Sequence, residues 1–360
     1  MAPASNEVVI LSGNTHPHLA NTICSRLGLK LASITLFHAA NRETLITLPE
    51  SVRSRDVYIV QTATNTNVND ALMELMLMGY TCKTSAAKNI VGILPYMPYG
   101  KQTKQRKRGA IASKLLAKLI VRSGFTHIVT VDLHHKEIQG FFDIPVENLR
   151  ASPFLINFVQ EMIFEKQIDR SNLVVVAHHT SSMRRATAYA ERFRVDIAVL
   201  HGSPEAETDV VDGRSSPPPI RAFDMVAGGD SFPMFTAHKA FHTPLNLVGN
   251  VTNKVAIMVD DIIDEVEHFI TAAQFLKDLG ATHVYIVATH ALFSTEQADK
   301  LQNSIIDLIV VTNTIPHDAL SEHYDKIRTI DISILLTEAI RRLHNQESLS
   351  YLFTDVSVED

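Results

Sequence analysis

The chain has 360 residues, 46% of them hydrophobic, and its 39 acidic and 33 basic residues give a net charge of −6. This charge argues against a general affinity for nucleic acid, and the two cysteines are too few for a disulfide framework. No apolar run approaches the roughly 20 residues that a membrane span needs, and the N-terminus has no signal-peptide pattern. We therefore expect a cytoplasmic protein of two α/β domains.

Residues 1–150 alternate apolar runs with segments of helical periodicity. The predicted strands are Glu7–Gly13, Leu45–Leu48, Asp56–Gln61, Asn89–Pro95 and Val129–Asp132, and the predicted helices are His18–Leu27, Asn69–Met78 and Ala110–Arg122. This alternation predicts a mostly parallel sheet covered on both faces.

Residues 151–310 repeat this outline and predict a second domain of the same fold. Its predicted strands are Asn172–Ala177, Ile197–His201, Val255–Val259 and His283–Thr289. The run Gly124-Phe-Thr-His127 has a counterpart in Gly280-Ala-Thr-His283, each followed by a histidine at the same spacing, which suggests internal duplication.

The last segment, 311–360, is expected to pack back on the first domain. It contains predicted strands at Val310–Pro316 and Ile327–Ile332 and an apolar helix at Ser333–His344. By contrast, residues 202–252 combine prolines, glycines and acids with little periodicity. They predict either a surface lid or an insertion without a role.

An acidic stretch follows the apolar run Val255–Val259. Asp260 and Asp261 stand where open α/β sheets bind ligands, which indicates a ribose or metal site. A loop that holds phosphate needs glycines and hydroxyls, yet acids follow here. Asp264 and Glu267 have the spacing of a capping box, so we expect this helix to satisfy its own N-terminus.

Two further groups have chemistry to offer. The run 101–108 contains five cations and could bind an anion, act as a nuclear-import signal or form a solvated loop. Asp132, His134 and His135 follow a strand, as do His178 and His179. Each set is either structural or a contact for a metal or nucleotide.

The chain resembles the ribose-phosphate diphosphokinase (phosphoribosyl pyrophosphate synthetase) family along nearly its whole length. The matching runs are Glu50–Arg53, Asp56–Gln61, Met73–Met78, Asp132–His134, Ile138–Val146, Val311–Pro316, Glu338–Arg342 and Ser350–Phe353. The resemblance implies two phosphoribosyltransferase-like domains, diphosphoryl transfer from Mg-ATP to ribose 5-phosphate, and assembly into oligomers.

The same resemblance implies that the catalytic pattern has been lost. Glu265, Glu267 and His268 replace the Thr, Gly and Thr of the family's phosphoribosyl-binding loop, although Asp260, Asp261 and Asp264 match it. Gly202 occupies the position of the family's catalytic lysine. Two further positions are replaced: Lys101 stands where the family has an ATP-contacting arginine, and His179 where it has a metal-binding aspartate. Other positions are retained: Gln102, Asn41 and Glu43 match nucleotide-binding residues, and His134 matches a metal contact.

A regulatory anion site is implied by a third set of matches, namely Ser51, Arg53, Arg108, Asp143, Ser348 and Ser350. Within the family the chain is most similar to the synthetase-associated members. We therefore expect a non-catalytic regulatory subunit that inhibits the catalytic synthetase chains it binds. It should form homo- and hetero-oligomers and control phosphoribosyl pyrophosphate supply for nucleotide biosynthesis. It should require no cofactor and bind Mg²⁺ and nucleotide weakly. A weakly active enzyme is the alternative, and a nucleic-acid-binding module on residues 101–108 is disfavoured.

Overall fold

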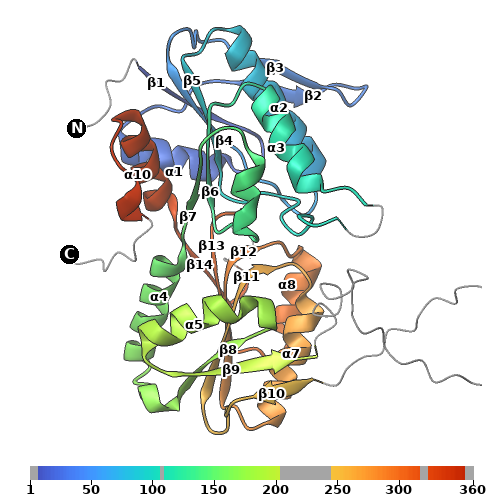
Figure 1. Ribbon diagram of the computed structural model, residues 1–360, viewed down its shortest axis with the longest axis vertical. Helices are drawn as coiled ribbons and strands as arrows, with labels where there is room; N and C mark the ends of the chain where they lie inside the picture. Colours follow the sequence, from blue (N-terminus) through green and yellow to red (C-terminus); the bar gives the residue numbers. More distant parts are fainter. Residues whose placement is uncertain (1–6, 106–108, 203–244, 317–322, 353–360) are drawn as a thin grey trace, which may run out of the picture.

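Parallel strands buried on both faces form the frame of each half of the chain (Figure 1). The computed structural model describes residues 7–105, 109–202, 245–316 and 323–352. Within these ranges, a five-stranded and a seven-stranded sheet are accompanied by a two-stranded hairpin. The predicted class of two α/β domains with mostly parallel central sheets is confirmed.

The first domain contains a parallel sheet in the order β1-β4-β5-β6-β7 and an antiparallel hairpin of β2 and β3. Its elements are β1 (Val8–Ser12), α1 (Pro17–Leu27), β2 (Thr35–His38), β3 (Thr44–Thr47), β4 (Asp56–Val60), α2 (Val68–Thr84), β5 (Asn89–Leu94), α3 (Ala112–Arg122), β6 (His127–Val131), the 3-10 helix η1 (Lys136–Phe141) and β7 (Val146–Leu149).

The second sheet has the order β10-β9-β8-β11-β12-β13-β14, and β10 is its antiparallel strand. The elements from α4 onward are α4 (Ser152–Glu165), η2 (Arg170–Asn172), β8 (Leu173–Ala177), η3 (Thr180–Ser182), α5 (Met183–Phe193), β9 (Asp196–His201), β10 (Asn246–Val248), β11 (Val255–Ile263), α7 (Val266–Asp278), β12 (His283–Ala291), α8 (Thr295–Gln302), β13 (Leu308–Thr312), β14 (Ile327–Ile330), α10 (Ser333–His344) and η4 (Ser350–Leu352).

The duplication is visible in the topology. A strand–helix unit, a hairpin and then four parallel strands occur in both halves, so β1-β4-β5-β6-β7 corresponds to β8-β11-β12-β13-β14 and the hairpin β2–β3 to β9–β10. The repeated Gly-x-Thr-His motif does not mark equivalent positions, however. His127 begins β6, the fourth strand of the first series, whereas His283 begins β12, the third strand of the second series.

Part of the predicted loop 202–252 is regular structure. Residues 203–244 lie outside the described residues, but β10 pairs with β9 through Asn246 and His201. The prediction of an irregular segment up to residue 252 was therefore wrong at its end.

One hydrophobic core runs through both domains. It joins the inner faces of the two sheets to α1, α4, α5 and α10, while α2 with α3 and α7 with α8 cover separate cores on the outer faces. The C-terminal helix α10 lies beside α1, although the two are at opposite ends of the chain (Figure 1). Arg26 of α1 bonds Asp331 at 3.0 Å, and His344 of α10 bonds Asp56 at 3.1 Å, so the C-terminal segment contacts the first domain directly.

Candidate functional site

The two aspartates lie within a strand that is longer than predicted. β8 pairs with β11 only as far as Ala177 opposite Val259, whereas β11 continues beside β12 to Ile263. Asp260 and Asp261 therefore face the space beyond the end of β8, and they are only 4% and 3% exposed. Two buried carboxylates require positive partners or hydrogen-bond donors, because burial strongly disfavours an unpaired charge.

Asp261 obtains its partners from both domains. Nδ1 of His134, between β6 and η1, lies 2.6 Å from its Oδ2, and Nη1 of Arg185 in α5 lies 3.0 Å from its Oδ1. Burial acts to raise the pKa of Asp261, but the Arg185 charge and the His134 hydrogen bond outweigh it and hold that pKa well below its usual value. This contact links the first domain to the second.

The His134 imidazole responds in the opposite direction. Burial acts to lower the pKa of His134, yet its hydrogen bond to Asp261 and the charge of that carboxylate raise the pKa overall. Burial likewise acts against the Arg185 charge, and Asp261, Asp132 and Asp260 together raise the Arg185 pKa. The site therefore favours charged His134 and Arg185 over neutral forms.

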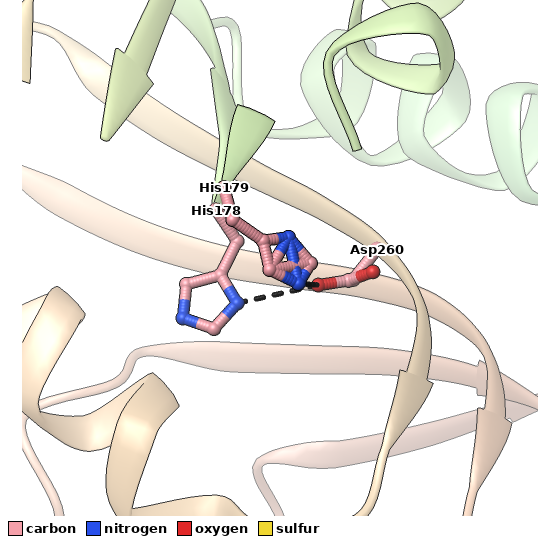
Figure 2. Close-up of side chains that lie close together, drawn as sticks. All are labelled: His178, His179 and Asp260. Carbon is pink, nitrogen blue, oxygen red and sulfur yellow. Dashed lines mark hydrogen bonds and ion pairs between the residues drawn. The ribbon is translucent and has the colours of Figure 1, made fainter. Parts of the chain in front are cut away.

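Asp260 has a separate set of partners. The side chains of His178 and His179 both point toward Asp260 (Figure 2). His178 Nδ1 lies 3.2 Å and His179 Nε2 lies 3.6 Å from Asp260 Oδ2. The other oxygen, Oδ1, accepts the backbone N–H of Asp261 at 2.8 Å and faces Arg185 at 3.7 Å. The two histidines and Asp260 offer one nitrogen or oxygen each, all within 4.8 Å of one another, and could hold a metal ion.

A second layer of polar contacts closes the boundary between the domains. Asp132 Oδ2 accepts the Ala151 N–H at 3.1 Å and the Thr289 hydroxyl at 2.8 Å. The His290 ring is buried between the Val131 carbonyl at 3.1 Å and the Thr314 hydroxyl at 2.9 Å, and burial lowers the pKa of His290.

The predicted capping box at the start of α7 is not formed. The N-cap is Glu265, whose side chain makes no cap hydrogen bond. Asp264 and Glu267 are engaged elsewhere, by Lys101 Nζ and Lys300 Nζ respectively, each at 2.7 Å. Asp264 Oδ1 also accepts the Glu265 N–H at 3.0 Å, but that N–H belongs to the N-cap residue and not to the first turn of the helix.

Two further residues were expected to replace catalytic or binding positions, namely His268 in α7 and Gly202 after β9. His268 Nε2 lies 2.6 Å from Glu265 Oε2. Gly202 follows β9 with a positive φ of 93°, next to the exposed His201. The start of α7 therefore carries two carboxylates, of which Glu265 is paired with His268 and Glu267 with Lys300.

The residues expected to bind nucleotide are Lys101, Gln102, Asn41 and Glu43. Lys101 reaches the acidic stretch through Asp264, and Gln102 stays beside it through an N–H bond to the Tyr99 carbonyl at 3.0 Å. Asn41 and Glu43 lie in the exposed turn of the β2–β3 hairpin, where the Asn41 side chain accepts the Glu43 N–H at 3.1 Å.

The expected anion-binding residues form two pairs. Ser51 Oγ accepts the Arg53 N–H at 3.4 Å, and the Ser348 and Ser350 hydroxyls lie 2.8 Å apart. Asp143 is exposed, and Arg108 lies outside the described residues. No hydrogen bond or ion pair between described residues connects one pair to the other.

One central residue, Arg185, was not among the residues predicted for the site, although it contacts both aspartates. His178, which contacts Asp260, was predicted only as one of two histidines that follow a strand. Their place in the sequence could have indicated them. Because β8 ends at Ala177, the residues that follow it lie at the same carboxyl end of the sheet as Asp260.

Comparisons with known proteins cover both halves of the chain. Residues 8–124 match the N-terminal domain of ribose phosphate pyrophosphokinase, and residues 169–354 match the phosphoribosyl synthetase-associated domain. Phosphoribosyl pyrophosphate synthase-associated protein 2 of Homo sapiens is 47% identical over 357 residues, covering 98% of this chain and 95% of that protein.

Two further relatives extend the comparison to synthetases. Ribose-phosphate pyrophosphokinase 2 of Schizosaccharomyces pombe is 37% identical over 352 residues, which cover 98% of each chain. The crystal structure of phosphoribosylpyrophosphate synthetase from Mycobacterium smegmatis superposes with a TM-score of 0.79 at 28% identity, covering 95% of this chain and all 100% of that one. Among the described residues, we also find no helix with the length and apolar character of a membrane span.

Proposed function

Because the chain belongs to the ribose-phosphate pyrophosphokinase family, in the branch of its synthase-associated proteins, we propose that it is a non-catalytic subunit that lowers the output of catalytic chains. It would bind those chains in a mixed oligomer in the cytosol and so control phosphoribosyl pyrophosphate supply. Both cysteines, Cys24 and Cys82, are buried free thiols, which suits a reducing compartment.

The start of α7 is the observation that carries the proposal. A helix N-terminus normally attracts phosphate through its free N–H groups and its dipole. Here the approach is lined by Asp264, Glu265 and Glu267. The repulsion between a phosphate charge and one carboxylate about 4 Å away is up to about 4 kcal/mol at an effective dielectric of about 20. Solvent screening at the exposed Glu265 and Glu267 reduces this repulsion. Several such terms together disfavour ribose 5-phosphate.

Positive charge is also missing where a diphosphoryl group would develop negative charge. Gly202 has no side chain to supply it, and Lys101 is held by Asp264 at 2.7 Å. Removing one such electrostatic partner typically costs a factor of about 100 to 1,000 in rate. The combination supports loss of catalysis with retention of the scaffold.

Exposed apolar side chains support association with a partner chain. Phe37 and Leu45 are directly opposite each other on the β2–β3 hairpin and are 49% and 45% exposed. Leu115 and Leu119 of α3 are also exposed. Large exposed apolar side chains at helical and cross-strand spacing are typical of surfaces that are covered in an assembly.

One assay tests the proposal and its alternative. The purified chain, given Mg-ATP and ribose 5-phosphate, should form no phosphoribosyl pyrophosphate. Added to a catalytic ribose-phosphate pyrophosphokinase, it should co-elute with that enzyme and lower its rate. Turnover by the chain alone would support weak catalysis instead, which the identity to the Schizosaccharomyces pombe pyrophosphokinase favours. Unchanged rate without co-elution would reject the regulatory role.

We further propose that Mg²⁺ and nucleotide bind only weakly, and that the pairs Ser51–Arg53 and Ser348–Ser350 meet an anion such as ADP when subunits assemble. Calorimetric titration of ADP into the chain alone and into the mixed complex separates these cases. Tight binding to the isolated chain, or none to the complex, would contradict the proposal.

A further inference from the structure

His178, His179 and Asp260 form a ligand set from two neighbouring strands (Figure 2). The histidines directly follow Ala177, the last residue of β8, and Asp260 directly follows Val259, which is paired with Ala177 in β11. The set therefore lies where the pairing of the two strands ends. His178 and Asp260 are buried and His179 is half-buried.

The spacing of the donor atoms matches that of a tetrahedral ion. Two ligand atoms each about 2.0–2.1 Å from Zn²⁺ lie about 3.3 Å apart in a tetrahedron. Asp260 Oδ2 is 3.2 Å from His178 Nδ1 and 3.6 Å from His179 Nε2. The two nitrogens lie within 4.8 Å of each other, so all three donor atoms surround one small volume.

The surroundings hold both rings in place. His179 Nδ1 lies 3.3 Å from the Ser181 hydroxyl and 3.4 Å from the Ser182 hydroxyl, which directs the Nε2 atom toward Asp260. The His178 ring stacks on Phe269 with centroids 4.3 Å apart. A hydrogen-bonded second nitrogen is the usual companion of a metal-ligating histidine.

The donor set leaves one carboxylate oxygen for a cation. Arg185 contacts Asp260 through Oδ1, and Oδ2 faces the two histidines. Two imidazoles and one carboxylate suit Zn²⁺ and similar transition ions, whereas Mg²⁺ prefers an all-oxygen octahedral shell.

We propose that His178, His179 and Asp260 bind one Zn²⁺-class ion, with a fourth position open to water or another small ligand. The ion would clamp β8 to β11 beyond their last paired residues. This site is independent of the regulatory function proposed above, since it requires neither a partner chain nor a phosphate substrate.

The test uses the full-length protein after removal of metals with a chelator. Titration with Zn²⁺ in competition with a chromophoric chelator should give one equivalent bound, and Zn²⁺ should raise the thermal unfolding temperature. Co²⁺ should bind with the visible spectrum of nitrogen and oxygen ligands and without a thiolate band. Mg²⁺ at the same concentration should not displace either ion.

His179→Gln is the diagnostic variant because its side chain is the least buried of the three. We expect its Zn²⁺ affinity to fall by more than the roughly 10–100-fold typical of second-layer changes, with the metal-free unfolding temperature unchanged. His283→Gln is the matched control, because His283 begins β12 and lies at the opposite end of the strands from the site. This variant should bind Zn²⁺ as tightly as wild type. Wild type that binds no Zn²⁺, or His179→Gln that binds it as tightly as the control, would overturn the assignment.

Discussion

Replacing Arg185 with glutamine should destabilise the protein, because Arg185 is the one side chain among the described residues seen to contact both aspartates. Its Nη1 lies 3.0 Å from Asp261 and 3.7 Å from Asp260. Glutamine preserves much of the length but removes the charge. The two carboxylates then remain buried beside each other, with histidine side chains as their remaining partners.

The size of the effect follows from these distances. At an effective dielectric of about 20, unit charges at 3.0 and 3.7 Å interact by about 5.5 and 4.5 kcal/mol. Much of this gross attraction is offset by the desolvation of Arg185. Breaking a buried ion pair from one side costs about 3–5 kcal/mol net. We expect a loss of unfolding free energy in that range at neutral pH.

Urea unfolding followed by circular dichroism measures the loss, since the chain has no tryptophan to report on folding. Arg184→Gln is the matched control, because Arg184 is the exposed neighbour and its replacement should change stability by no more than about 0.5 kcal/mol. Adding Asp261→Asn to Arg185→Gln should recover part of the loss. If Arg185→Gln were no less stable than Arg184→Gln, the acid pair would not depend on this cation.

Three other predictions concern pH, phosphate and association. His134→Gln should lower the unfolding free energy by about 1.5–3 kcal/mol near pH 6. Because the pKa of His134 is raised in the folded protein, its stabilising contribution is present below about pH 6.5 and is lost as pH rises through the folded pKa. The difference in unfolding free energy between variant and wild type, measured with urea, should therefore shrink in alkali, and a constant difference would contradict the charged pair. Replacing Glu265 and Glu267 with glycine should raise the affinity for inorganic phosphate by about tenfold or more in calorimetry, and unchanged affinity would show that these carboxylates do not control anion binding. Phe37→Asp should weaken co-elution with a catalytic pyrophosphokinase by about tenfold or more while leaving the unfolding temperature of the isolated chain unchanged, and full retention of binding would exclude the hairpin from the interface.

The elements that could be predicted from the sequence are those whose apolar residues recur at regular spacing. The helix Ser333–His344 was predicted with its observed bounds because its apolar residues recur at helical spacing. Strands β2 and β7 were missed because one is largely exposed and the other is a half-buried edge strand, so neither presents a continuous apolar run. α2 was predicted too short, since polar residues after Met78 conceal two further buried positions, Gly79 and Cys82.

The site was less predictable because its charges are balanced by residues far apart in sequence. A strand was expected to end at Val259, since two aspartates follow, yet β11 keeps both aspartates buried and continues to Ile263. Their partners, His134 and Arg185, lie 127 and about 75 residues away along the chain. The capping box failed for the same reason. Local spacing favoured Asp264 and Glu267 as caps, but Lys101 and Lys300 hold them instead.

The buried acid pair explains how this scaffold could lose a reaction and still fold. Asp260 and Asp261 need compensation whether or not a metal ion binds, because two buried carboxylates are costly alone. The chain itself supplies that compensation through Arg185 and the surrounding histidines. The start of α7, in contrast, is exposed, and acids there are screened by solvent and paired with surface cations. Changes at that helix start can therefore abolish phosphate binding at little cost to stability, whereas changes at the acid pair cannot.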